Sequence, residues 1–266
     1  MPLRQPSLTS AAALSFAILA PRNAFAEGWT PSATEFPTNA ESVAAGEFGL
    51  RGGWSAGLVP PFRAGERDRL ALGADARGWV GTHIRLTLSE EWLTDTTAAG
   101  SPVSGFGDFR VGTALAVLNR PTFAIGAGWE GKLPNADDAG ELGTDETDFT
   151  FGLWGGVSRG RWSGIAALGI GILGNPLRFA NQDDVPVARL NAAFSPGPFQ
   201  FSAGVSADLQ TSRNPAHIEA LAAIRYGKRW FIEIAGTAGF VPAAANESGT
   251  LRFGYAWALP EPPAGE

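Results

Sequence analysis

The stretch Phe199–Gln210, with the sequence FQFSAGVSADLQ, alternates strictly between two kinds of residue. Every odd position from Phe199 to Leu209 is apolar, and every even position is glycine or polar. A period of two is the repeat of a β-strand, because successive side chains point to opposite faces. The pattern therefore predicts a strand that separates two different solvents.

The same alternation continues over most of the chain and predicts about twelve strands. The clearest others are 108–118, 121–132, 218–226, 230–240 and 251–259. Less regular strands are predicted at 45–58, 67–77, 80–92, 147–158, 161–173 and 185–194. Most have about 10–13 residues, which is longer than is usual in soluble proteins and enough for a tilted strand to cross a bilayer. A few large apolar residues fall on the polar faces, so either the register there is off by one or the enclosed side is partly apolar: Trp154, Ile165, Leu221 and Phe231.

The connections between these strands alternate in length. Short links are predicted at 77–79, 119–120, 159–160, 195–197 and 227–228, and longer ones at 59–66, 93–104, 133–146, 174–184 and 241–248. Bacterial outer-membrane barrels have tight turns on the periplasmic side and longer loops outside. The alternation of short and long links predicts an all-β fold, namely a closed antiparallel up-and-down transmembrane β-barrel of about twelve strands. Both ends of the chain are predicted to lie on the periplasmic side.

Aromatic residues gather at the predicted strand ends, as in the two interfacial girdles of such barrels. Those beside the short links are Phe123, Trp162, Phe194, Phe199, Tyr226, Trp230 and Trp257, and those beside the long ones are Trp54, Trp92, Phe106, Trp129 and Phe149. The alternative is that these rings fill the core of a soluble β-sandwich.

The N-terminus is typical of an export signal. Arg4 precedes an apolar run at 11–20, and Ala24-Phe25-Ala26 predicts cleavage after Ala26, so residues 1–26 are assigned as a signal peptide. The run is shorter than the roughly 20 residues that a spanning helix needs. Residues 27–44 are predicted as a periplasmic N-terminal lead-in or a short insert in the lumen, residues 45–259 as the barrel, and residues 260–266 as a C-terminal tail.

Charge and composition exclude several classes of function. Without residues 1–26 the chain keeps 18 basic and 26 acidic residues, a net charge of −8, which argues against a nucleic-acid partner. It has no cysteine, and neither a G-x-S-x-G nor an H-E-x-x-H motif is present. His83 is predicted as a solvated group on the inner face of a strand, and His217 as a loop residue. We therefore expect no enzyme, no cofactor and no metal centre.

The acidic segment 133–146 leaves one alternative open. It could bind Ca²⁺, although it lacks the spacing of an EF-hand, and acidic external loops are common as solvated surface. The residues proposed for this ion are Asn135, Asp137, Asp138, Glu141, Asp145, Glu146 and the following Asp148.

The polar faces of the predicted strands carry charges of both signs. Such residues either line a wet passage or pair across a narrow lumen and fill it. The candidate pore-lining residues are Arg51, Arg85, Arg110, Glu130, Lys132, Arg189, Asp208, Glu219, Arg225, Glu233 and Arg252, and Asp75, Arg77 and Asp108 fall on the same polar faces.

The middle of the chain resembles a known family. The residues on which this resemblance rests are Gly105-Phe106-Gly107-Asp108-Phe109, Lys132-Leu133-Pro134-Asn135, Leu142-Gly143-Thr144, Asp148 and Gly152. This pattern is similar to that of the transporter-like outer-membrane barrels named for the meta-pathway of phenol degradation. Pro-Asn-Ala replaces Pro-Thr-Gly of the family, and Gly-Thr-Asp replaces Gly-Thr-Gly. The resemblance implies an outer-membrane barrel with a transport role and supplies no catalytic residue.

Three hypotheses about function follow. The first is a transporter or narrow channel of the outer membrane for small molecules, hydrophobic or aromatic ones among them. Its partners would be outer-membrane lipid, the outer-membrane assembly machinery and a small solute. The second is a non-conducting structural or adhesion barrel. The third is a soluble periplasmic β-sandwich or lipocalin-like binder.

Overall fold

The structure is a computed structural model that describes residues 30–31, 42–58, 67–81, 83–97, 102–136, 142, 147–173, 183–209, 217–240 and 247–260. All regular elements in these residues are strands. They are β1 (Ser42–Leu58), β2 (Arg67–Val80), β3 (Ile84–Thr97), β4 (Val103–Phe106), β5 (Phe109–Arg120), β6 (Phe123–Leu133), β7 (Asp148–Arg159), β8 (Trp162–Leu173), β9 (Asp183–Phe194), β10 (Phe199–Asp208), β11 (His217–Tyr226), β12 (Trp230–Gly239) and β13 (Glu247–Pro260). Within this part of the chain, no helix has the length and apolarity needed to cross a membrane.

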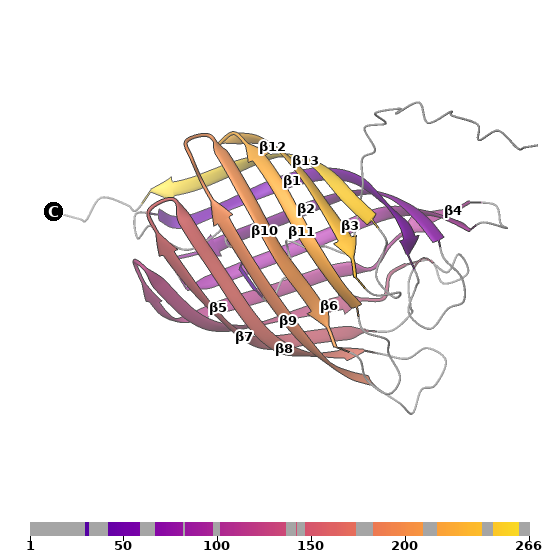
Figure 1. The fold of residues 1–266 in the computed structure, drawn as a ribbon, viewed down its shortest axis with the longest axis horizontal. Helices are drawn as coiled ribbons and strands as arrows, with labels where there is room; N and C mark the ends of the chain where they lie inside the picture. The colour runs from indigo at the N-terminus through magenta and orange to yellow at the C-terminus, as the bar shows by residue number, and fades with distance from the viewer. Residues whose placement is uncertain are drawn as a thin grey trace, which may run out of the picture.

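The strands form a closed wall, which Figure 1 shows from the side. Neighbouring strands of the wall pair antiparallel, and β1 pairs with β13, so the last strand closes onto the first. β3 pairs with β5 over one half of its length and with β4 over the other. The register shifts by one residue at Gly107-Asp108, so β4 and β5 are one wall strand interrupted by a bulge. The predicted barrel of twelve antiparallel strands is confirmed.

The short turns all lie at the end of the barrel where β13 also ends, on the left in Figure 1. Four of them contain a glycine with positive φ, among them Gly81 at 60°. The predicted short link at 77–79 is wrong, because β2 continues to Val80 and the turn lies at Gly81–His83. His83 is consequently an exposed turn residue rather than a residue on the inner face of a strand. The predicted link 93–104 is also wrong in part, since β3 runs to Thr97 and β4 begins at Val103.

The wall is apolar outside and ionised inside. Outward side chains such as Leu168, Leu153 and Val117 are about 70% exposed, whereas the inward Arg85 is 1% exposed. Aromatic pairs lie near both ends, with Trp230 and Tyr255 4.8 Å apart at the short-turn end and Trp92 and Phe106 5.0 Å apart at the other. A soluble β-sandwich or lipocalin-like binder would bury these apolar rows, so that hypothesis is wrong.

The lumen is partly apolar, which was one of the two explanations for the large apolar residues on the predicted polar faces. Trp154, Ile165, Leu221 and Phe231 are all buried inside the wall. Trp154 and Ile165 belong to an inner cluster that also holds Trp79 and several alanines. The register was therefore correct, and the apolar residues on the polar faces fill space in the lumen.

We expect the Gly126→Ala substitution to destabilise the barrel by about 1–3 kcal/mol, because the site is already full. A Cβ at Gly126 would lie 2.5 Å from Cζ2 of Trp154 and would press on the backbone oxygen of Leu115. The Gly155→Ala variant is the control, since the nearest atom to its new Cβ would lie 4.0 Å away. Equilibrium unfolding in urea measures both variants, and equal losses would contradict this packing.

Candidate functional site

The inner wall over β1, β2, β11 and β13 carries a buried ionic network centred on Glu47. Its carboxylate accepts hydrogen bonds from Arg77 Nε at 2.5 Å, Arg225 Nη1 at 2.6 Å and Arg252 Nη1 at 2.6 Å. Glu47 and two of these partners, Arg77 and Arg252, are almost fully buried, so the charges compensate one another away from solvent.

Arg252 links Glu47 to a second carboxylate. Its Nε and Nη2 donate to the two oxygens of Asp75 at 2.9 and 2.5 Å. Gly49 of β1 pairs with Asp75 in the register, and a Cβ at Gly49 would collide with the Arg252 guanidinium group. Phe231 completes the cluster, with the Arg225 guanidinium 3.5 Å from the centre of its ring. The absence of a side chain at Gly49 is what lets an arginine of β13 reach across β1 to β2.

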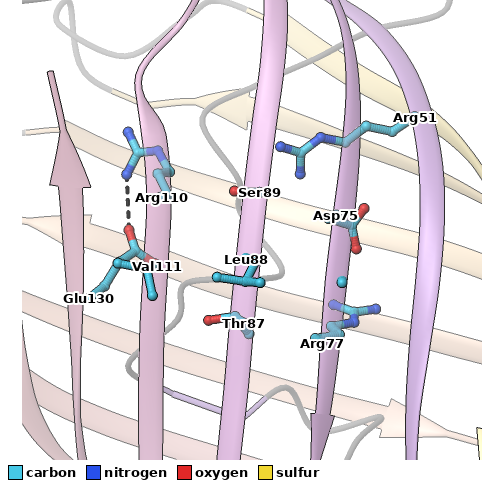
Figure 2. A pocket seen from close by; sticks show the side chains of 10 residues that line it. Arg51, Asp75, Arg77, Thr87, Leu88, Ser89, Arg110, Val111 and Glu130 are labelled. Carbon is cyan, nitrogen blue, oxygen red and sulfur yellow. Dashed lines mark hydrogen bonds and ion pairs between the residues drawn. The ribbon is translucent and has the colours of Figure 1, made fainter. Parts of the chain in front are cut away.

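A cavity of about 270 Å³, including the space that opens to solvent, lies on the inner face beside this network. Its polar lining comes from five adjacent wall strands, β1, β2, β3, β5 and β6, and consists of Arg51, Asp75, Arg77, Thr87, Ser89, Arg110 and Glu130. Figure 2 shows Arg51 and Arg110 on either side of the β3 residues Thr87 and Ser89. Arg110 donates to Glu130 at 2.9 Å, and Arg51 pairs with Glu91 at 2.9 Å.

The residues of the family resemblance come together beyond this cavity, towards the long connections. Lys132 Nζ lies 2.7 Å from Asp148 and 3.4 Å from Asp108, and all three are buried or nearly so. Asn135 accepts a hydrogen bond from the backbone N–H of Phe109. These contacts tie the start of the 133–146 connection to the bulge between β4 and β5.

The same connection places an apolar side chain inside the barrel mouth. Leu142 is buried against Ala71 of β2 and Leu93 of β3, and Ala136 packs on this group. The acidic residues proposed for Ca²⁺ at 137, 138, 141, 145 and 146 lie outside the described residues, so the calcium alternative is not tested. Of its two described members, Asp148 pairs with Lys132 and Asn135 bonds to Phe109.

The segment before β1 also contacts the lumen. Thr30 and Pro31 are buried, and the Thr30 carbonyl accepts a hydrogen bond from Arg85 Nη1 at 3.1 Å. The inner face of β3 shows how the Thr30 contact, the cavity and the Leu142 contact follow one another along the barrel. From the short-turn end it presents Arg85, then Thr87 and Ser89, then Leu93. With about 3.3 Å per residue along a strand, the cavity lies between the Thr30 contact and the Leu142 contact. The assignment of the rest of 27–44 stays a prediction.

The structure places the candidate pore-lining residues on the inner face of the wall. Three separate groups hold all of them except Arg85. Arg51, Arg110 and Glu130 line the cavity with Lys132 beside it, Arg225 and Arg252 belong to the Glu47 network with Glu233 between them in register, and Arg189, Asp208 and Glu219 lie nearer the long connections. Arg85 faces Thr30. Whether they line a conducting path stays a prediction.

Several inward ionised residues were not among those candidates. They are Glu47, Arg69, Glu91, Asp95 and Asp148. Glu47 lies next to the outward Phe48, but the alternation in β1 is weak because glycines interrupt both of its faces, Gly49 and Gly53 inside and Gly46 and Gly52 outside. His217 was predicted as a loop residue at the start of a strand. It does begin a strand, β11, but it belongs to the wall and is buried there, with its Nε2 3.1 Å from Glu219.

The wall closes on itself, its exterior is apolar and its interior is ionised. These three features define a β-barrel of the outer-membrane class.

No protein-family model matches this chain, and no curated protein matches it in sequence. Solved structures do share the fold. An outer membrane channel from Pseudomonas putida F1 is 12% identical, with a TM-score of 0.59 over 84% of this chain and 98% of that one. The NanC porin is 11% identical, with a TM-score of 0.55 over 80% of this chain and all of its own. At such low identity the likeness establishes the fold alone, and the specific family resemblance stays a prediction.

Proposed function

We propose that this protein is exported, inserts into an outer membrane and passes small solutes through its lumen as a narrow channel or transporter. The observation that carries the proposal is the cavity among Arg51, Arg77 and Arg110 inside a wall whose outer face is apolar. A continuous apolar exterior of this kind is stable against lipid and not against water. The partners are membrane lipid, the assembly machinery and the solute, and no catalytic step is involved.

The barrel size supports a narrow path. Eight-stranded barrels are filled by side chains, and sixteen-stranded porins enclose an open channel. Twelve strands enclose an intermediate bore, which the ion pairs narrow further. The resemblance to transporter-like barrels supports the same function, and hydrophobic or aromatic solutes remain within the proposal.

Planar bilayers and liposome swelling test this function. We expect the refolded protein to give discrete current steps and to admit small solutes, while larger ones are excluded. Unfolded protein in the same detergent is the control. Folded, heat-modifiable protein that gives neither current nor swelling would overturn the proposal.

The second candidate function is a structural barrel whose lumen is closed. The buried contact of Thr30 and Pro31 with Arg85 favours it, because it puts main chain inside the wall. A deletion of residues 28–38 separates the two candidates. If the segment obstructs the lumen, the deletion raises conductance several-fold, whereas removal of residues 261–266, beyond the end of β13, leaves it unchanged. Equal conductance of both deletions and the full chain would contradict the closed form.

A further inference from the structure

We propose that the cavity on the inner wall is a binding site for small carboxylates, with Arg110 as the anchor and the Thr87 hydroxyl as a second donor. The inference rests on the proposed function, since it names the class of solute that the lumen takes. It stands on the accessibility of one guanidinium, on a buried hydroxyl, and on the charge and size of the space between them.

Arg110 is the cavity arginine that a solute can reach. Its side chain is 29% exposed, against 8% for Arg51 and 6% for Arg77. Among the described residues its one hydrogen bond is from Nη1 to Glu130. A guanidinium group has five N–H donors in a planar fork, so this contact leaves an edge that matches a carboxylate.

Thr87 supplies a polar group that the wall itself does not use. Its residue is almost fully buried, and its Oγ1 has no hydrogen-bond partner among the described residues. A buried hydroxyl without a partner costs free energy. The Oγ1 atom is itself covered, so a ligand recovers this cost once the Thr87 side chain turns about χ1 towards the cavity that it lines. The register explains the empty space beside it, because Thr87 pairs with Gly112, which has no side chain to fill the gap towards Glu130.

The two donors are close enough to share one ligand. Arg110 pairs with Ser89, so Thr87 is its diagonal neighbour on the same face of adjacent strands. Diagonal neighbours lie about 7–8 Å apart, a span that a long arginine side chain and one carboxylate group bridge. Ser89 lies between them and offers a further hydroxyl.

The charges around the cavity favour an anion. Three guanidinium groups line it with two carboxylates, Asp75 and Glu130. Asp75 is held by two hydrogen bonds from Arg252, and Glu130 by Arg110. Arg51 and Arg77 are likewise held by Glu91 and Glu47, so Arg110, the most exposed of the three arginines, is the cation that an entering anion meets.

The cavity is a shallow recess in the wall of the lumen. Its enclosed part has room for about one water molecule, and most of the 270 Å³ is space that opens to solvent. A carboxylate group therefore enters the recess itself, and the rest of the acid lies in the open part of the space.

Calorimetric titration of the folded barrel in detergent tests the site without requiring transport. The probes are benzoate, the neutral benzamide and the cationic benzylamine. We expect benzoate to bind at least about tenfold more tightly than the other two, since only it offers two anionic oxygens to Arg110. Equal affinities for benzoate and benzamide would overturn the proposal.

Variants identify the residues. The Thr87→Val variant keeps the shape of the side chain and should weaken benzoate binding by about tenfold, because a hydrogen bond to a charged group is lost. The matched control is Thr113→Val, on the outward face of β5, which should leave affinity unchanged. The double variant Arg110→Gln/Glu130→Gln removes the anchor and its partner together and should abolish the preference for benzoate over benzamide.

These results test the binding site and the channel function separately. A double variant that folds and keeps wild-type affinity for benzoate would contradict the binding site. Selective binding in detergent together with no swelling or conductance would contradict the channel function but not the carboxylate site. Solute uptake with no carboxylate binding by the wild-type barrel would contradict the carboxylate site but not the channel function.

Discussion

The Glu47→Ala substitution should destabilise the barrel by about 3–5 kcal/mol, the usual cost of removing one partner from a buried ionic network. Glu47 accepts hydrogen bonds from Arg77, Arg225 and Arg252, and its loss leaves those guanidinium groups close together without the carboxylate that all three share. A loss of this size is a large share of the stability of a typical domain. Urea-dependent unfolding of the barrel in lipid vesicles, with heat-modifiable gel migration as a second readout, measures it.

Two variants show whether the charge itself matters. The Glu47→Gln variant keeps the size and one acceptor oxygen and should cost less than Glu47→Ala. The exposed Glu247 of β13 is the matched control, and Glu247→Gln should change stability by no more than about 0.5 kcal/mol. If Glu47→Ala costs no more than Glu247→Gln, the network does not hold the wall together.

The Val205→Arg substitution should cost about 2–4 kcal/mol if Val205 faces the middle of a bilayer, because a guanidinium is expensive in hydrocarbon. Val205 is exposed on the outward face of β10, between Leu190 of β9 and Ala220 of β11. The free energy of folding into lipid vesicles is the quantity to measure.

The control is an arginine substitution at a residue of the same chain segment that lies nearer the membrane surface. Leu209 is also exposed but lies just past the end of β10, where the cost of an arginine falls to about 0–1 kcal/mol. Comparable losses at Val205 and Leu209 would mean that this face does not meet the hydrocarbon core, and the membrane assignment would lose its main support.

The local sequence predicted the wall well, for a physical reason. A strand between lipid and a polar lumen must alternate, so period-two stretches such as 199–210 and 230–240 match β10 and β12 to within one or two residues. The prediction was poorer where alternation fades. The turn at Gly81–His83 was misplaced because residues 77–80 continue the strand pattern, and β4 was missed because a four-residue strand gives almost no periodicity.

The candidate site was predictable only as a set of inward positions. Alternation placed Arg110, Glu130 and Arg252 on the inner face, but it carries no information about which strands become neighbours around a closed wall. Glu47 and Arg252 are far apart in the chain and meet because β13 closes onto β1. The same holds for the motif residues, since Lys132, Asp108 and Asp148 become one cluster only when β5, β6 and β7 pair.

The sequence by itself thus determined the strand pattern, the two solvents and the closed-barrel class, because each depends on residues next to one another in the chain. Tertiary structure alone decided the partners of each charge, the cavity beside Thr87 and the entry of Thr30 and Leu142 into the lumen. Those features depend on register, on shear and on glycines such as Gly49 and Gly112 that leave room for a neighbour's side chain, and none of them leaves a periodic trace in the sequence.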